Sequence, residues 1–227
     1  MVRDLELTSS DTVIEIGVGL GHLTERLLQS AGKVWAFEID PSLYEIAKER
    51  FEDESHLELF LLDGSRFQEK VSLSEDSNVH FVSNLPYSDY SRIMIAMLSV
   101  PHPVKSYTLM IQRDVYDRLK AKPGSKEYGP WSVLVQAMCS IRLLRKAGGR
   151  LFYPAPRVDS AVFRLERNTE IPPEEVESLL GALKTVFSHR RKVWREGKRP
   201  EEFSPGELIS RLRGPEEWKI LDPGGAS

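Results

Sequence analysis

The sequence predicts an α/β fold, in which a parallel, doubly wound sheet is followed by a small C-terminal helical domain. Short apolar runs alternate with helical patterns from residue 12 to residue 119, which is typical of such a sheet. A glycine-rich turn follows the first apolar run, and acidic or amide side chains follow the next ones. Because ligands bind at the carboxyl ends of the strands in this fold, we expect a site there.

The elements of the sheet are predicted in chain order from their apolar spacing. The expected strands are residues 12–16, 33–37, 57–62, 79–82 and 104–111. Helical patterns follow Leu23, Pro41, Ser91 and Asp114, and we expect Gly32 to close the first helix. Pro41 suits the first turn of the second helix because its N–H would have no partner there.

The pattern changes after residue 119. A polar loop rich in glycine and proline spans 121–130, and we expect a helix, a strand, a rigid loop and a strand at 131–138, 140–145, 152–156 and 159–166. The remainder is helical, with a long helix through 176–187 and a short one at 207–212. We therefore place a domain boundary near 168, which divides residues 1–168 from residues 169–227.

Composition indicates an ordinary soluble globular protein. The chain has 227 residues, is 41% hydrophobic and carries a formal charge of −3. It contains no apolar run long enough to span a membrane, and charge at the N-terminus argues against an export signal. Cys139 is the only cysteine, which excludes an internal disulfide, and the five histidines show no metal-ligand spacing. We expect a cytoplasmic monomer without a bound metal.

The glycine turn runs from Glu15 to Gly21, with glycines at 17, 19 and 21. Glycines after a strand let the backbone approach a ligand closely, although a tight strand-to-helix turn would need them as well. The spacing departs from the dinucleotide fingerprint because His22 stands where its last glycine would be. The turn therefore favours a nucleoside-containing ligand other than NAD.

Two carboxylates follow the next strands. Glu38 ends the second strand, where its oxygens can accept hydrogen bonds from both ribose hydroxyls. Asp63 follows the third strand, where it can accept from an adenine amino group. Either residue alone would more often be a solvated loop residue, but together with the glycine turn they predict an adenosine site.

Asn84-Leu85-Pro86-Tyr87 follows the fourth strand and is predicted to be catalytic. An adenine amine is a poor nucleophile, so an enzyme that methylates it must hold both N–H groups with acceptors and aim the nitrogen. The Asn84 oxygen and a backbone carbonyl beside Pro86 can do this, and Tyr87 can stack on a flipped base. A plain strand-to-loop turn would also contain Asn and Pro.

These motifs resemble the S-adenosylmethionine-dependent rRNA adenine N6-dimethyltransferases. The resemblance is colinear from about Glu15 to Lys192, and it is closest to the bacterial small-subunit enzyme, which methylates two adjacent adenosines. It rests on these segments: Glu15-x-Gly17-x-Gly19, Glu38, Asp63, Asn84 to Tyr87, Pro123 to Gly129, Phe152 to Ser160 and Phe187 to Lys192.

The resemblance implies a Rossmann-like class I methyltransferase sheet in residues 1–168 and an RNA-contacting helical domain in residues 169–227. It implies S-adenosylmethionine as cofactor, with small-subunit rRNA as substrate and a role in ribosome assembly. The residues it assigns to the cofactor are Glu15, Gly17, Gly19, Glu38, Asp63 and Asn84. Asn84, Leu85, Pro86 and Tyr87 would hold the target base. Phe152 is a second stacking candidate, or a core aromatic beside two prolines.

A basic stretch from Ser188 to Arg199 contains Arg190, Arg191 and Lys192, which we predict to contact RNA phosphates. A solvated helix face would show the same composition. The sequence departs from the family where Val193-Trp194-Arg195-Glu196 replaces a Thr-Leu-Arg-Asn-like segment. The family's N-terminal lid segment is also expected to be absent.

Two other functions remain open for this sequence. The chain could be an RNA-binding assembly or transcription factor that keeps the fold without catalysis, as the expected lack of a lid suggests. It could also methylate another planar amine or amide, such as DNA adenine or a glutamine side chain. Those families more often carry Pro where Leu85 stands, and the basic helical region would have no obvious purpose in them.

Overall fold

The computed structural model describes residues 2–73, 78–86, 89–100, 104–149, 158–168 and 171–214. The chain forms two compact units, which are considered separately. The first comprises residues 1–113 and 142–167, and the second comprises residues 114–141 and 168–227. The predicted division into 1–168 and 169–227 differs from these units at residues 114–141 and at residue 168.

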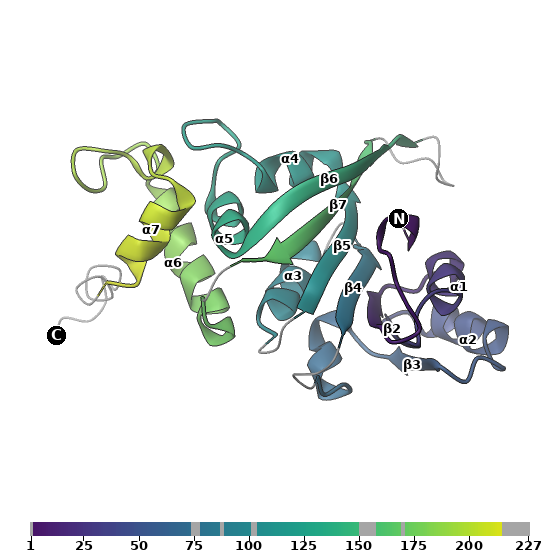
Figure 1. The fold of residues 1–227 in the computed structure, drawn as a ribbon. Coiled ribbons are helices and arrows are strands. Elements are labelled where there is room, and N and C mark those ends of the chain that lie inside the picture. The colour runs from purple at the N-terminus through teal and green to yellow at the C-terminus, as the bar shows by residue number, and fades with distance from the viewer. Residues whose placement is uncertain are drawn as a thin grey trace. The chain divides into compact units, whose positions relative to one another are not determined.

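Within the described residues, seven strands form one sheet in the order β3-β2-β1-β4-β5-β7-β6 (Figure 1). The strands are β1 (Thr12–Ile16), β2 (Lys33–Glu38), β3 (Leu57–Leu61), β4 (Val79–Asn84), β5 (Val104–Gln112), β6 (Cys139–Ala147) and β7 (Ser160–Arg167). β1 is central, because Ile14 pairs with Trp35 of β2 on one side and with Phe81 of β4 on the other. This position explains why β1 is buried from Val13 to Ile16.

The first five strands, β1 to β5, are parallel, as predicted. The sheet continues beyond β5 with β7 and β6, which were not predicted to belong to the parallel sheet. β7 pairs antiparallel with β5, from Tyr107 opposite Leu165 to Gln112 opposite Ser160. The alternating pattern of β7 predicted a strand correctly. It carried no information on direction, because a period of two is the same for parallel and antiparallel neighbours.

Helices α1 (His22–Leu28), α2 (Pro41–Arg50) and α3 (Tyr90–Leu98) connect the parallel strands, together with a 3-10 helix, η2 (Gly64–Glu69). Asp40 caps α2, since its Oδ1 accepts from the N–H groups of Ser42 and Leu43. The prediction that Gly32 closes α1 was wrong, because that helix ends at Gln29. Gly32 instead lies where a Cβ atom would be 1.9 Å from the Ser9 carbonyl oxygen, so only glycine fits.

The core of the first unit contains a chain of packed aromatic rings. Phe67 of η2 contacts Phe37 of β2 and Phe81 of β4 edge to face, with ring centroids 6.3 and 5.1 Å apart. Phe81 in turn stacks on Tyr107 of β5 at 5.4 Å. These four buried side chains hold three strands and the connection between β3 and β4 together.

The second unit is helical, with α4 (Arg113–Leu119) leading into it and α5 (Pro130–Met138), α6 (Val176–Ser188) and α7 (Pro205–Leu212) packed together. The buried Tyr128 hydroxyl donates to the Phe203 carbonyl at 3.0 Å, and its ring contacts Phe187 at 5.9 Å. Residues 114–141 therefore group with the C-terminal helices because α5 buries its apolar face against α6 and α7.

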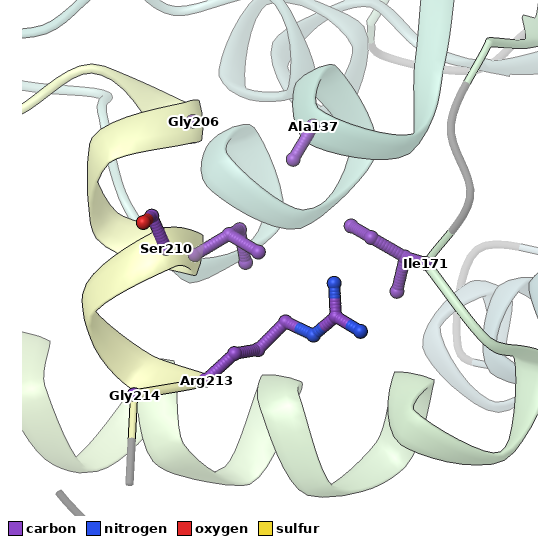
Figure 2. A pocket seen from close by; sticks show the side chains of 7 residues that line it. Ala137, Ile171, Gly206, Ser210, Arg213 and Gly214 are labelled. Carbon is purple, nitrogen blue, oxygen red and sulfur yellow. The ribbon is translucent and has the colours of Figure 1, made fainter. Parts of the chain in front are cut away.

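A cavity of about 390 Å³ lies within the second unit, next to α5 and α7 (Figure 2). Arg213 extends across it toward Ile171, while Gly206 and Ser210 line it from α7 (Figure 2). The Arg213 guanidinium pairs with Glu175, just before α6, at 2.8 Å. This side chain thus links α7 to the start of α6.

None of the helices in the described ranges is long and apolar enough to cross a membrane. In the same ranges, His, Cys, Asp and Glu side chains form no group of three that could hold a metal ion.

Candidate cofactor and substrate site

A cavity of about 450 Å³ in the first unit brings six of the predicted site residues together. It lies where β1, β2 and β4 end, and it continues to the turn after β3 and the start of α3. Its lining residues are Ile16, Gly17, Gly19, Phe37, Glu38, Ile39, Asp63, Gly64, Asn84, Pro86, Asp89, Arg92 and Ile93. The volume is within the usual range for small-molecule sites.

The glycine turn between β1 and α1 adopts a conformation that needs glycine. Gly17, Gly19 and Gly21 have φ values of 82°, 58° and 79°, all in the left-handed region. At Gly21, a Cβ atom would also lie 2.6 Å from the Phe51 ring. The glycines therefore shape a turn whose backbone faces the cavity at positions 17 and 19.

The glycine turn and the predicted catalytic turn are adjacent because β1 and β4 are neighbours in the sheet. The Ser83 hydroxyl donates to the Ile16 carbonyl, which ties the ends of the two strands together. A Cβ atom added to Gly17 would lie 3.7 Å from the Asn84 carbonyl oxygen. A ligand bound against the glycine turn would thus lie next to Asn84.

Glu38 is buried at the end of β2, and its carboxylate organises the backbone around the cavity. Oε2 accepts from the Gly19 N–H at 2.8 Å, and Oε1 accepts from the Ile39 and Asp40 N–H groups at 2.9 and 3.0 Å. Glu38 therefore fixes the glycine turn relative to β2. It also leaves acceptor capacity on Oε2, since a carboxylate oxygen can take two hydrogen bonds.

Asp63 caps η2 and faces the same cavity. Its Oδ1 accepts from the N–H and hydroxyl of Ser65 at 2.9 and 2.8 Å, and its Oδ2 accepts from Arg92 at 3.0 Å. Burial opposes ionisation, but the Ser65 hydrogen bonds and the Arg92 guanidinium outweigh it and lower the pKa of Asp63. Asp63 is thus an ionised acceptor at neutral pH.

The predicted catalytic turn is described up to Pro86. Asn84 is exposed at the last position of β4 and lines the cavity with Pro86. The Leu85 side chain is buried, and its N–H donates to the Met110 carbonyl at 3.0 Å. Leu85 therefore anchors the turn to β5 while Asn84 and Pro86 remain accessible. Tyr87 lies outside the described residues, as does Phe152.

Glu15 differs from the other predicted cofactor residues, because it does not line the cavity. Its side chain is fully buried, and neither carboxyl oxygen has a hydrogen-bond partner in the structure. Burial raises the pKa of Glu15 to about 8, and the negative charge of the nearby Glu38 acts in the same direction. Glu15 is therefore mostly protonated at neutral pH, and it lies in β1 outside the cavity.

Seven cavity residues were absent from the predicted set of site residues: Ile16, Phe37, Ile39, Gly64, Asp89, Arg92 and Ile93. Ile39 and Gly64 directly follow Glu38 and Asp63, so their positions could have been inferred from those acids. At Gly64, a Cβ atom would lie 2.2 Å from the Ile16 Cγ2 atom, which explains the glycine. Arg92 had no signal, since a single arginine in a helical pattern is ordinarily a solvated residue.

The three predicted RNA-contacting cations lie in the second unit and have different surroundings. Arg191 and Lys192 are exposed. The Arg190 guanidinium pairs with the mostly buried Glu201 at 2.7 Å and donates to the Lys126 and Ser125 carbonyls. Arg190 thus holds the 121–130 loop, a contact that explains its presence without RNA.

The sheet order and a cavity at the strand ends, lined by the glycine turn, Glu38 and Asp63, define a class I S-adenosylmethionine-dependent methyltransferase fold. A family model described as ribosomal RNA adenine dimethylase matches residues 1–204, and the chain belongs to this family. The family resemblance inferred from the motifs is thereby confirmed.

Two relatives agree with this assignment, and a solved structure shares the fold. The chain is 34% identical over 195 residues to a ribosomal RNA small subunit methyltransferase A of Clostridium acetobutylicum, covering 85% of this chain and 71% of that protein. It is 35% identical over 215 residues to the protein of the same name in Clostridium perfringens, covering 93% and 74%. A dimethyladenosine transferase structure from Plasmodium falciparum shares the fold, with a TM-score of 0.76, 22% identity and coverage of 93% and 92%.

Proposed function

We propose that this protein uses S-adenosylmethionine to dimethylate the N6 atoms of two adjacent adenosines in small-subunit rRNA, as a step linked to ribosome assembly. Family membership and the names of the Clostridium relatives support the reaction and the substrate class. The small ribosomal subunit is accordingly the proposed partner. Action in the cytoplasm as a monomer stays our prediction.

The observation that carries the proposal is that the residues expected to bind the methyl-donating cofactor and those expected to bind the methyl-accepting adenine line one cavity. Gly17, Gly19, Glu38 and Asp63 offer what an adenosine-based cofactor needs, namely close backbone approach and two carboxylates. Asn84 and Pro86 line the same cavity. A methyl donor and a target amine bound to these two sets would be neighbours.

The cofactor residues would act by holding and orienting. Glu38 would accept from the ribose through the lone pair that its bond to Gly19 leaves on Oε2. Asp63 would accept from the adenine amino group, and Gly17 and Gly19 would border the methionine portion. S-adenosylmethionine supplies an electrophilic methyl group when it is bound.

Asn84 and Pro86 would prepare the target amine for attack. The Asn84 carboxamide oxygen and a backbone carbonyl beside Pro86 would accept from the two N–H groups of N6. These acceptors hold the nitrogen near tetrahedral geometry and direct its lone pair, while the excess proton leaves after the cationic product forms. Because the Leu85 anchor to Met110 fixes the turn, this arrangement is preorganised and supplies catalysis by positioning.

Methyl transfer to ribosomal subunits tests the proposal. Purified protein, radiolabelled S-adenosylmethionine and unmethylated small subunits should give labelled small-subunit RNA, whereas large subunits should stay unlabelled. Absence of label, under conditions in which a Clostridium relative labels the same subunits, would contradict catalysis by this chain.

Cofactor titration separates the enzyme from an RNA-binding factor that keeps the fold. The enzyme should bind S-adenosylmethionine and its demethylated product with measurable heat in calorimetry. Binding of small-subunit RNA without any binding of the cofactor would favour the non-catalytic alternative.

A further inference from the structure

Arg92 is a cavity residue to which neither the motifs nor the proposed reaction assigns a role. It lies in the first turn of α3, six residues beyond Pro86, and its side chain is 62% exposed. Its Nη2 donates to Asp63 Oδ2 at 3.0 Å and approaches the Ser65 hydroxyl at 3.4 Å. A basic side chain thus points into a cavity that also contains the carboxylates of Glu38, Asp63 and Asp89.

The lone pairs of Asp63 are almost all occupied. A carboxylate has about four acceptor sites, two on each oxygen. On Oδ1 both sites are taken by the N–H and hydroxyl of Ser65, and on Oδ2 one site is taken by Arg92. One acceptor site therefore remains, on Oδ2, and its direction is set by the bond to Arg92.

We propose that Arg92 is a positioning residue, which fixes Oδ2 of Asp63 as the acceptor for the cofactor's adenine amino group and so selects adenosine over a deaminated nucleoside. The inference rests on the proposed function, because it assumes a cofactor in this cavity. A remaining acceptor site complements an amine, which donates. It repels the carbonyl oxygen that deamination places at the same position, because two acceptors then face each other.

Arg92 acts on the ligand through Asp63 in two ways. It restrains the carboxylate, which is only partly buried and would otherwise rotate and take a water molecule into its free site. It also helps Ser65 to keep the pKa of Asp63 low, so that Oδ2 remains an acceptor in mildly acidic solution. Both effects favour a donor on the ligand.

The test compares two ligands on each protein by calorimetry, namely S-adenosylhomocysteine and its deaminated inosine analogue. Wild-type protein should prefer the adenosine form by about 10- to 100-fold, as expected for a hydrogen bond to a charged group. In Arg92→Ala the preference should fall by about fivefold or more, and Arg92→Lys should restore part of it. Because both ligands are measured on each protein, a partly unfolded sample does not change the ratio.

Arg66→Ala is the matched control. Arg66 is also an exposed arginine paired with a carboxylate, Glu69 at 2.6 Å, but it does not line the cavity. This variant should keep the wild-type preference.

The outcomes distinguish the inference from the proposed function. If S-adenosylhomocysteine does not bind to wild-type protein, the proposed function fails and the inference fails with it. If it binds and Arg92→Ala keeps the wild-type preference, only the inference is overturned. Tighter binding of S-adenosylhomocysteine to Arg92→Ala would also overturn it, because Arg92 would then compete with the cofactor for Asp63.

Discussion

Asn84 occupies the one exposed position of β4, directly after five buried residues. The side chain is therefore accessible to a ligand, while its backbone pairs with Met110 of β5. We predict that Asn84→Ala lowers methyl transfer by about 100-fold or more, because one preorganised polar contact is lost from the transition state. Cofactor affinity in calorimetry should change by less than about threefold.

The mechanism would be wrong if Asn84→Ala retained full turnover. Arg66→Ala, at a residue that does not line the cavity, is a suitable control in the same assay, and it should keep wild-type turnover.

Glu15 gives a prediction on stability rather than on turnover. Its folded-state pKa of about 8 is above its ordinary value of 4.5, so the folded protein binds a proton that the unfolded chain releases. The free energy of unfolding should therefore fall as the pH rises from about 4.5 to 8, by about 1.4 kcal/mol per unit of pKa difference at most. Glu15→Gln, which is neutral at every pH, should remove this dependence and be more stable than wild type at pH 8.

Urea unfolding at pH 5 and pH 8 measures this effect. If the free energy of unfolding of Glu15→Gln depended on pH as strongly as that of the wild-type protein, Glu15 would be ionised in the fold. A motif-based prediction could not foresee the burial, because a glutamate before a glycine turn is compatible with a place either in the cavity or outside it.

The starts of three strands meet at a buried histidine, which should make the stability of the protein depend on pH. His80 of β4 contacts the Ser106 hydroxyl of β5 at 2.8 Å and lies 3.7 Å from the Asp11 carboxylate, just before β1. Burial lowers the pKa of His80 and outweighs the opposing effect of Asp11. The imidazole is therefore neutral in the fold, whereas the unfolded chain takes up a proton below about pH 6.5.

Acidification from pH 7 to pH 5 should thus lower the stability of the wild-type protein through His80, because the unfolded state binds more protons there. His80→Gln should be less sensitive to pH in this range when unfolding is followed by circular dichroism. The lowered pKa of Asp11 acts separately, since its stabilisation is lost only below about pH 4. Equal pH dependence in wild type and His80→Gln would contradict this assignment.

The basic segment after α6 separates into structural and exposed cations. Arg190 is held by Glu201 and two carbonyls of the 121–130 loop, so Arg190→Ala should destabilise the protein by about 1–3 kcal/mol in urea unfolding. Arg191→Ala should change stability by less than about 0.5 kcal/mol, because its side chain is exposed.

The effects on RNA binding should be the reverse of the effects on stability, with the exposed cations mattering more than Arg190. Arg191→Ala and Lys192→Ala should each weaken the binding of small-subunit RNA and reduce the salt dependence of the affinity by about one unit of log–log slope. If neither change alters the salt dependence, the exposed cations of this segment do not contact phosphates.

Most of the first unit could be predicted from the sequence. Buried parallel strands are recognisable as short apolar runs, and the polar residues that line the cavity follow the ends of these runs. The cavity accordingly contains Gly17, Gly19, Glu38, Asp63, Asn84 and Pro86, as the strand-end argument required. Arg92 could not be found, since its role depends on a contact with Asp63, 29 residues away, that has no local pattern.

At the scale of the whole molecule, the division into two units was harder to predict from the sequence than the positions of the helices and strands. Residues 114–141 continue the alternation of helices and strands in the chain, so they read as part of the sheet domain. The structure groups them with the second unit because the buried face of α5 packs against α6 and α7. Packing partners of this kind are set by side chains distant in sequence, which periodicity does not reveal.

The most direct test of the proposed function is the chemical identity of the product. Small-subunit RNA from the transfer reaction should be digested to nucleosides and analysed by mass spectrometry. We predict N6,N6-dimethyladenosine at up to two residues per subunit, in wild type but not in Asn84→Ala. Small-subunit RNA that contains no methylated adenosine, or only methyl groups on other nucleosides, would contradict the account.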